Sequence, residues 1–307
     1  MAKVTENLFI YRGGLGKKVL NKYASSLDEL IDELKYHFFY LQGTFNIKSG
    51  YTTEALDFYR KAHELVRDSY EGIGELYLNI ATCLSILGYT ANAIVFLEDI
   101  HEISKGRTKS SKSIVNHMLA NEHTRLGHLL KAKKLLDECY NEIMISDDKR
   151  LRGTLLISYG NLYRKLIDWN MALKYFDQAL DCFDKGNTNY LSALYRKTLC
   201  YVEMKSSSAC VELLVEGKKL SQESKKYTIL FESLEHQMTP NDEKSINYLE
   251  TIALPYFLEM SANHTALYYC EFLREHYEKK GLQKKTLQMT EIARTIYIKM
   301  LKGGMLV

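Results

Sequence analysis

Small and large apolar residues follow one another along the chain in an order that returns about every forty residues. In GYTTEALDFYRKAHEL, the large Tyr59 lies four residues after the small Ala55, and the small Ala62 lies three residues further on. Equivalent trios are Ala93, Leu97 and Ile100; Ala132, Leu136 and Cys139; Ala172, Phe176 and Ala179; and, more faintly, Cys210, Leu214 and Gly217. The first members of successive trios are 38, 39, 40 and 38 residues apart, which indicates an internal repeat.

Steps of four and three residues place side chains on one face of a helix, where a small side chain lets a second helix pack closely. Twelve residues before each trio lies another small residue, on a predicted partner helix: Gly43, Ala81, Ala120 and Gly160. One helix pair cannot bury its apolar face alone, so the pairs must stack, as in tetratricopeptide repeats. The predicted fold is all-α: a right-handed superhelix of about five to six tetratricopeptide-like helical hairpins with a C-terminal capping helix.

The spacing of the repeats also divides the chain into two parts. Residues 36–307 are predicted to form the repeat domain, with repeats near 36–68, 73–105, 113–145, 152–185 and 190–222 and capping helices over 226–307. Residues 1–35 form a separate segment, in which Gly13, Gly14 and Gly16 interrupt the helical apolar spacing. Each glycine inside a helix costs about 1 kcal/mol relative to alanine, so we expect this segment to be frayed or held only by tertiary contacts.

Composition and charge narrow the class of protein. Only 2 prolines favour long helices over a β-sandwich with Pro-rich turns. No apolar run is long enough to span a membrane and the N-terminal residues lack a signal-peptide core, so we expect a cytoplasmic protein. The six cysteines form no CxxC pair and are expected to be free thiols. A net charge of +3 is too small to indicate nucleic acid or a membrane surface as the main partner.

Motifs of familiar enzyme classes are missing from the sequence: there is no P-loop, GxGxxG, GxSxG or HExxH. His117, His123 and His128 are six and five residues apart, so we expect ordinary polar helix positions rather than a metal site. Neither a cofactor nor a metal is expected. The 23 tyrosines are interpreted as packing between helices, with a stacking platform for nucleic-acid bases as the alternative.

Polar residues of the first helix of each hairpin are predicted to line a concave wall. One register position on this wall holds Thr44, Thr82, Asn121 and Asn161. Asn and Arg side chains on such a wall can pair with peptide amides and carboxylates. The predicted peptide-binding residues are Thr82, Asn121, Thr124, Arg125, Ser158, Asn161 and Arg164. The alternative is that these side chains simply face water.

Three segments resemble the Rap family, the response-regulator aspartate phosphatases of Gram-positive spore formers. They are LKYHFFYLQGTFNIKSGYTTEALDFYRKA, LLISYGNLYRKLIDWNMALKYFDQAL and IYIKMLKGGMLV, and the resemblance covers nearly the whole chain. It implies an N-terminal three-helix bundle, joined by a linker helix to the repeats, that docks on a response regulator of sporulation or competence. It also implies a Gln on the third bundle helix that positions the hydrolytic water, and a re-imported signalling peptide in the concave array that switches the protein off.

The sequence departs from the family pattern at both implied sites. It begins about where the third bundle helix begins, so residues 1–35 would be a remnant of the bundle and linker, with Glu6 at the position of the Gln. A carboxylate there would repel a like charge 4 Å away by about 1 kcal/mol in water and about 4 kcal/mol near a protein surface. The family's backbone-binding Asn falls on Ser158, and its acidic residue falls near Thr124 or Arg125. We therefore expect a peptide unlike the usual Arg-containing type.

The resemblance thus predicts an intracellular regulator that binds a bacterial response regulator and is controlled by a short signalling peptide. Dephosphorylation of the regulator is the implied reaction, with Glu6 as the candidate catalytic residue. The alternative is a non-enzymatic scaffold or peptide sensor that sequesters its partner. A repeat-bearing transcription factor is disfavoured, because the repeats begin near residue 36 and a helix-turn-helix domain needs about 55 to 65 residues.

Overall fold

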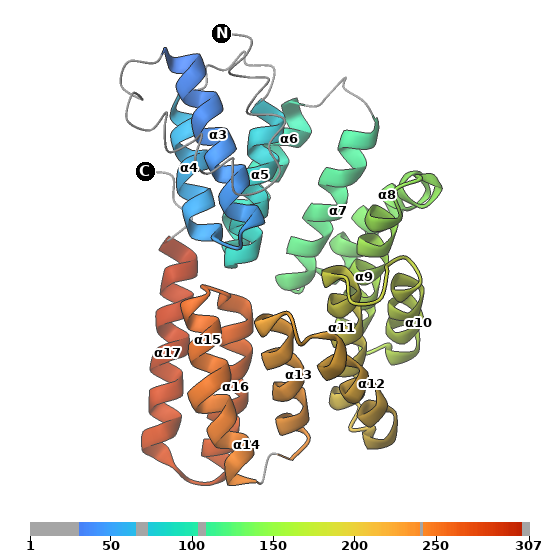
Figure 1. The fold of residues 1–307 in the computed structure, drawn as a ribbon, viewed down its shortest axis with the longest axis vertical. Coiled ribbons are helices and arrows are strands. Elements are labelled where there is room, and N and C mark those ends of the chain that lie inside the picture. Colours follow the sequence, from blue (N-terminus) through green and yellow to red (C-terminus); the bar gives the residue numbers. More distant parts are fainter. Residues whose placement is uncertain (1–30, 66–72, 104–108, 240–241, 303–307) are drawn as a thin grey trace.

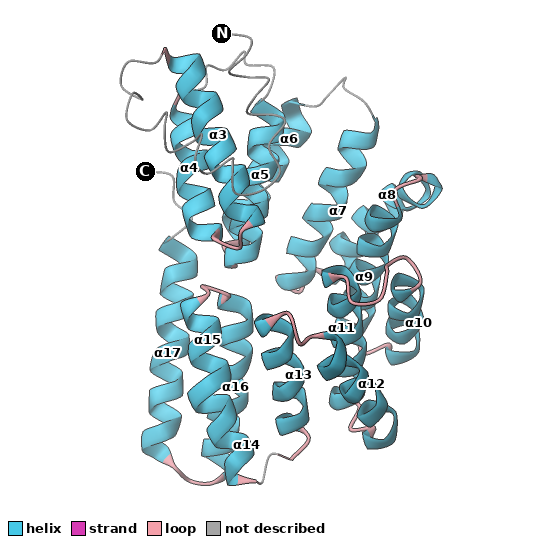
Figure 2. Cartoon of the chain, viewed as in Figure 1, coloured by secondary structure: helices cyan, strands magenta, loops and turns pink. Residues whose placement is uncertain are grey.

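The computed structural model describes residues 31–65, 73–103, 109–239 and 242–302, and every element in these ranges is helical (Figures 1 and 2). Consecutive helices pair into hairpins, which confirms the predicted all-α repeat fold. Five hairpins come first: α3 (Asp32–Lys48) with α4 (Thr52–Glu64), α5 (Ile73–Leu87) with α6 (Thr90–Ile103), α7 (Lys109–Arg125) with α8 (Leu129–Ile145), α9 (Lys149–Lys165) with α10 (Trp169–Leu180), and α11 (Thr188–Glu203) with α12 (Ser207–Leu220). They are followed by α13 (Lys225–Gln237), α14 (Glu243–Tyr248), η2 (Leu249–Ala253), α15 (Leu254–Glu259), α16 (Asn263–Lys279) and α17 (Gln283–Lys302).

The helix after α13 is continuous but widened at its centre. The π-helical turn η2 joins α14 to α15 without a break, and Pro255 is the second residue after this turn. Proline has no N–H and its ring crowds the carbonyl four residues earlier, so a regular α-turn cannot continue through it. The wider π-turn relieves this conflict and lets the chain remain helical from Glu243 to Glu259.

In the first four hairpins, a small residue on the first helix is matched by a large side chain on the second. A Cβ added to Gly43 of α3 would lie 2.6 Å from the ring of Tyr59 of α4, which fills the space that the glycine leaves. Gly160 of α9 and Phe176 of α10 repeat this contact, with a distance of 2.5 Å. Two smaller pairs at the same sequence separation are fully buried: Ala81 with Leu97, and Ala120 with Leu136. The repeating small and large residues of the sequence are therefore the contacts between paired helices.

The two ends of the stack contact one another, although they are far apart in sequence. Asn263, at the start of α16, is 3% exposed, and its Nδ2 donates a hydrogen bond of 2.6 Å to the carbonyl oxygen of Leu87 at the end of α5. Beside it, Thr90 Oγ1 lies 3.2 Å from His264 Nε2. Gly88, with a φ of 82°, makes this approach possible, because a Cβ there would lie 3.3 Å from both Asn263 and His264. The C-terminal helices therefore lie against the α5–α6 hairpin (Figure 1).

We predict that Gly160 and Phe176 are energetically coupled. Gly160→Ala introduces a methyl group against the Phe176 ring, and Phe176→Leu leaves a void; each change should destabilise the fold by about 1–3 kcal/mol. The double variant recreates the Ala–Leu pairing of α5–α6 and α7–α8, so it should recover at least about 1 kcal/mol of the summed loss. Urea unfolding followed by circular dichroism gives all three values.

The matched control for this cycle is Gly74→Ala in α5. A Cβ at Gly74 would have no heavy atom within 4 Å, so this substitution should stabilise the protein by about 0.5–1 kcal/mol through helix propensity alone. Additive effects of the two substitutions at Gly160 and Phe176 would contradict the role assigned to the pair.

Candidate functional site

The predicted threonines bond to their own helices. Thr82 Oγ1 donates to the Leu78 carbonyl oxygen at 2.8 Å, and Thr124 Oγ1 donates to the Ala120 carbonyl oxygen at the same distance. Thr124 is also 7% exposed. Because each hydroxyl hydrogen is already donated to the backbone, these two residues are poorer peptide donors than the sequence suggests.

Ser158 lies between two neighbouring first helices and is not open to a ligand. It is 4% exposed; its Oγ donates to the Thr154 carbonyl oxygen at 3.0 Å and lies 2.8 Å from His117 Nε2 on α7. Burial lowers the pKa of His117 to about 4, so the imidazole is neutral at pH 7. Ser158 therefore joins α9 to α7 rather than binding a peptide, and its partner, 41 residues away, has no local signal in the sequence.

The two predicted asparagines keep most of their hydrogen-bonding capacity. Both Asn121 and Asn161 are partly exposed. Asn121 Nδ2 makes only a long contact of 3.5 Å with His117 Nε2, and Asn161 has no hydrogen bond with any described residue. A primary amide that is partly shielded and unpaired can bind one peptide unit through its donor and its acceptor together.

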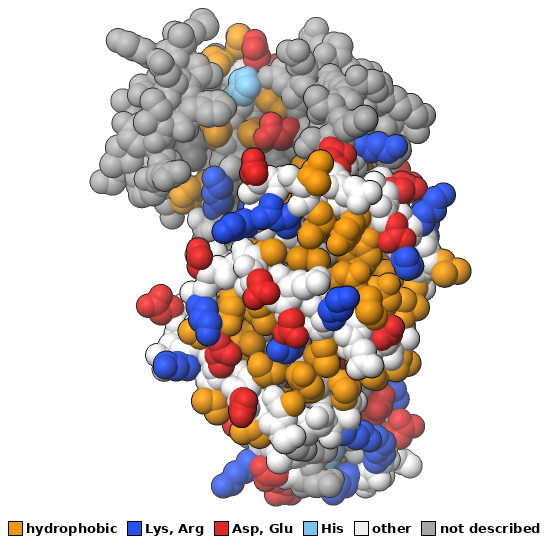
Figure 3. Space-filling view, turned by 90° about the vertical axis from the view of Figure 1, so that its right-hand side faces the viewer, with side chains coloured by type: hydrophobic (Ala, Val, Ile, Leu, Met, Phe, Trp, Pro, Cys, Tyr) orange, Lys and Arg blue, Asp and Glu red, His pale blue; other side chains and the backbone are white. Residues whose placement is uncertain are grey.

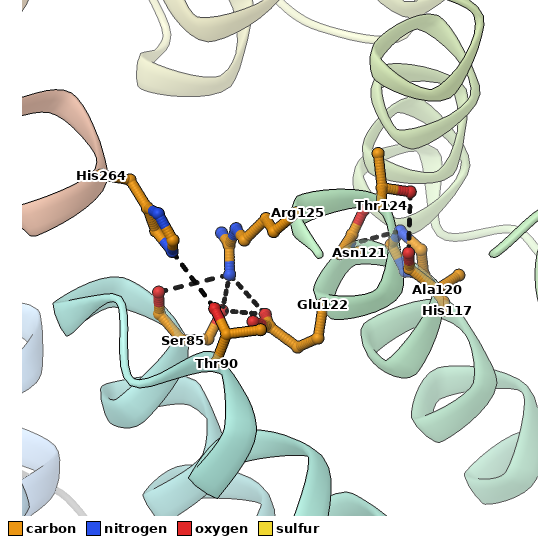
Figure 4. Close-up of polar contacts among 9 residues, drawn as sticks. All are labelled: Ser85, Thr90, His117, Ala120, Asn121, Glu122, Thr124, Arg125 and His264. Atoms are coloured by element: carbon orange, nitrogen blue, oxygen red, sulfur yellow. Dashed lines mark hydrogen bonds and ion pairs between the residues drawn. The ribbon is translucent and has the colours of Figure 1, made fainter. Parts of the chain in front are cut away.

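Arg125, whose side chain is 36% exposed, belongs to a polar cluster around the buried Glu122 that sequence reasoning did not find (Figure 4). Glu122, one turn before it on α7, is 1% exposed and forms an ion pair with Arg125 Nη1. Ser85 of α5 donates to Glu122 Oε1 at 2.6 Å and accepts from Arg125 Nη1 at 2.6 Å. The i,i+3 spacing of Glu122 and Arg125 was the available signal. Because the carboxylate is buried, its pairing with Arg125 is required by the fold.

Arg164 is engaged in a comparable pair one repeat further along. Its Nη1 lies 2.6 Å from Glu203 Oε1 on α11, and the two side chains are 18% and 27% exposed. Arg164 is 39 residues after Arg125, and Glu203 is 39 residues after Arg164, so all three occupy equivalent positions. The two predicted arginines are thus held by carboxylates of the protein itself.

Two further cations of the inner wall were missed from the sequence: Arg196 of α11 and Lys226 of α13. Burial lowers the pKa of Arg196, and the charges of Arg164 and Arg125 lower it further. Burial also lowers the pKa of Lys226, and Arg196 adds to this effect. Arg196 does not occupy the repeat position that Arg125 and Arg164 share, so the period of the sequence does not reveal it.

His264, next to Asn263 at the start of α16, lies near both Thr90 and Arg125. Figure 4 shows His264 beside Thr90 and Arg125, which come from α6 and α7. Burial lowers the pKa of His264 to about 4, and the charge of Arg125 contributes in the same direction. A cation of α7 and a neutral imidazole of α16 therefore lie side by side, although their residues are far apart in sequence.

His123 and His128 lie close together, although their spacing of five residues predicted the opposite. The turn at Gly127, with a φ of 78°, brings His123 and His128 together, with 3.4 Å between their Nδ1 atoms. The prediction holds only for two residues of one helix, whereas α7 ends at Arg125, before His128. Among the described residues, no three His, Cys, Asp or Glu side chains are placed to hold a metal ion.

The remaining features of the described chain concern its surface and its termini. Lys and Arg side chains are intermixed with Asp and Glu on the face drawn in Figure 3, without a continuous basic stripe among the described residues. No helix in the described ranges is both long and apolar enough to cross a membrane. All six cysteines are described and are free thiols. Glu6, the candidate catalytic residue, lies outside the described residues.

Comparisons with known proteins agree with this architecture. No family model matches the chain. Response regulator aspartate phosphatase E of Bacillus subtilis (strain 168) is 24% identical over 225 residues, which are 70% of this chain and 60% of that relative's length. The structure of a Rap protein complexed with Competence and Sporulation Factor has a TM-score of 0.79 and 18% identity, covering 93% of this chain and 80% of that one. NprR in complex with its cognate peptide NprX has a TM-score of 0.77 and 18% identity, covering 92% and 82%. The predicted resemblance is confirmed in the fold.

We predict that His117 makes the protein less stable in mild acid. Its pKa is about 4 in the fold and about 6.5 in the unfolded chain, so the unfolded chain binds more protons between these values. Stability therefore falls as the pH decreases from 7 towards 4, by about 1–2 kcal/mol at pH 5 for this residue. His117→Gln, which keeps a polar group near Ser158 but does not titrate, should show a smaller loss in urea unfolding at pH 7 and pH 5.

The control for the pH experiment is Asn170→Gln, a substitution between two non-titrating side chains at an exposed position of α10, which should keep the wild-type difference between the two pH values. His264, whose pKa is also lowered to about 4, remains in both variants, so His117→Gln should reduce the pH dependence without removing it. An unchanged difference in His117→Gln would contradict the assignment.

Proposed function

We propose that this chain, which has the tetratricopeptide-repeat fold of the Rap and NprR regulators, binds a short signalling peptide on the inner wall of its hairpins. The observation that carries the proposal is the unused hydrogen-bonding capacity of that wall. Asn161 has no hydrogen bond with a described residue, and Asn121 has only its 3.5 Å contact with His117. Both lie on first helices of adjacent hairpins, α7 and α9, where an extended peptide would pass one and then the other.

Two of the solved relatives support a peptide as the ligand. The Rap structure contains Competence and Sporulation Factor, and the NprR structure contains its cognate peptide NprX. The contact between Asn263 and Leu87 adds a structural reason, because a stack closed at this point surrounds a ligand on several sides. An extended peptide exposes backbone amides along its whole length, and a row of side-chain amides can bind them without fixing the peptide's sequence.

For the protein partner, we propose a response regulator. The support is the sequence relative, which is named as a response regulator aspartate phosphatase and of which this chain covers 60%. Two activities are compatible with such a partner: hydrolysis of its phospho-aspartate, or sequestration without hydrolysis. Glu6 at the position of the family's Gln favours sequestration, because a carboxylate beside an acyl phosphate raises the energy of the site.

Peptide binding through the inner wall is tested by removing one amide. Asn161→Ala should weaken the binding of a peptide selected from a synthetic heptapeptide library by about tenfold, the effect of one or two lost hydrogen bonds. The matched control is Asn170→Ala, an exposed asparagine on α10, which should leave the affinity unchanged. Fluorescence anisotropy measures both. Equal losses in the two variants, or none in Asn161→Ala, would count against the inner wall as the site.

Hydrolysis and sequestration of a response regulator are distinguished by whether the bound regulator loses its phosphate. We expect the wild type to bind a phosphorylated regulator and to hydrolyse it at least about fivefold more slowly than Glu6→Gln, the factor that corresponds to about 1 kcal/mol of charge repulsion. Loss of radiolabelled phosphate and pull-down of the regulator give the two readouts. Fast hydrolysis by the wild type that Glu6→Ala abolishes would instead make Glu6 the catalytic residue.

A further inference from the structure

The charges of the inner wall do not balance within the protein. Arg125 is paired with Glu122, and Arg164 is paired with Glu203. Arg196 and Lys226 have no such partner: within the described residues, no carboxylate lies within 4.0 Å of either cation. The titratable groups that act most strongly on Arg196 are Tyr227, Arg164, Tyr195 and Arg125, and none of them is a carboxylate.

Arg196 also carries an unused donor that is shielded from water. Its Nε atom, like that of Arg164, is buried and has no hydrogen-bond partner, although Arg196 as a whole is partly exposed. A buried N–H of a charged group that lacks an acceptor costs free energy unless something else supplies that acceptor. The Arg196 guanidinium therefore combines an unpaired Nε–H with a charge that no carboxylate of the described residues compensates.

Lys226 approaches the same place from the next helix. α11 and α13 pack against each other, and the charge of Arg196 acts on Lys226. The Lys226 side chain is exposed by its accessible surface and yet surrounded closely enough by protein for its pKa to fall. Two cations on neighbouring, packed helices thus lie without a carboxylate partner among the described residues.

From this arrangement we infer that the ligand of the inner wall is an acidic peptide, which places a carboxylate between Arg196 of α11 and Lys226 of α13. The inference rests on the proposed peptide-binding function and specifies its ligand. A guanidinium binds a carboxylate through two parallel hydrogen bonds, and an ammonium group adds a third charged donor. Arg125 and Arg164 already form ion pairs with Glu122 and Glu203, whereas no carboxylate of the described residues pairs with Arg196 or Lys226.

A matched set of peptide pools tests the inference. Random heptapeptide mixtures are prepared with one central position fixed as Glu or as Gln, each with a free or an amidated C-terminus. Peptides retained by the full-length protein are identified by mass spectrometry, and the affinities of the best binders are measured by anisotropy. We expect Glu-containing binders to be at least about tenfold tighter than their Gln counterparts, with an affinity that falls as salt rises. Preference for the free C-terminus alone would locate the carboxylate at the peptide's end instead of in a side chain.

The protein variants separate this contact from general effects. Arg196→Gln should remove the preference for Glu over Gln, and Arg196→Lys, which keeps the charge without the bidentate geometry, should retain part of it. The control Arg150→Gln changes an exposed arginine of α9 and should keep the full preference. Because Arg196→Gln removes an unpaired shielded charge, the ligand-free variant should melt no lower than the wild type, which excludes misfolding as the cause.

The outcomes distinguish a failure of the inferred acidic ligand from a failure of the proposed peptide binding. Peptides that bind the inner wall equally well with Glu or Gln, and independently of Arg196, would overturn the inference and leave the proposed function in place. Inorganic phosphate that competes as well as the peptide would also overturn it, because the pair would then be a general anion site. Retention of no peptide from any pool would overturn the proposed function itself.

Discussion

The distance between paired helices depends on a small residue facing a large one, and the geometry of the interior follows from it. Gly43 and Gly160 leave room for the rings of Tyr59 and Phe176, so each ring occupies the place where a Cβ would otherwise be. The same contact between a glycine and an aromatic ring joins successive hairpins: a Cβ on Gly217 of α12 would lie 2.3 Å from the ring of Phe231 of α13. Since these contacts recur along the stack, a change in one of them alters where the following first helix presents its polar face.

The fold was predictable from the sequence because its main contacts are local and periodic. Ala81 and Leu97 lie 16 residues apart, as do Gly160 and Phe176, and a fixed separation of this kind is visible in the sequence. The closing contact was not predictable. Asn263 and Leu87 are 176 residues apart, and nothing near either residue indicates the other. Closure depends on the summed curvature of all the hairpins between them, which no single repeat specifies.

For the candidate site, the sequence predicted which helix carries each residue but not the hydrogen bonds that its side chain makes. Periodicity correctly assigns Thr82, Thr124 and Ser158 to first helices, but it does not state whether a hydroxyl donates to a ligand or to its own backbone. Short hydroxyl side chains in helices reach the carbonyl oxygen one turn earlier, and a partly buried position favours this bond because no water competes. Asn121 and Asn161 do not make this backbone bond, and they are the residues of the predicted set that remain available.

The inner wall thus separates charges that hold the fold from charges that are open to a ligand. A ligand carboxylate that displaced Glu122 from Arg125 would leave a carboxylate that is 1% exposed without its counterion. Breaking a buried pair in this way is more costly than the new pair is favourable. Arg196 and Lys226 require no such exchange, because the described chain offers them no carboxylate. Selectivity for an acidic ligand therefore arises from where the protein's own acids are placed: Glu122 and Glu203 neutralise the wall along α7 and α9, and their absence beside α13 leaves that stretch positive.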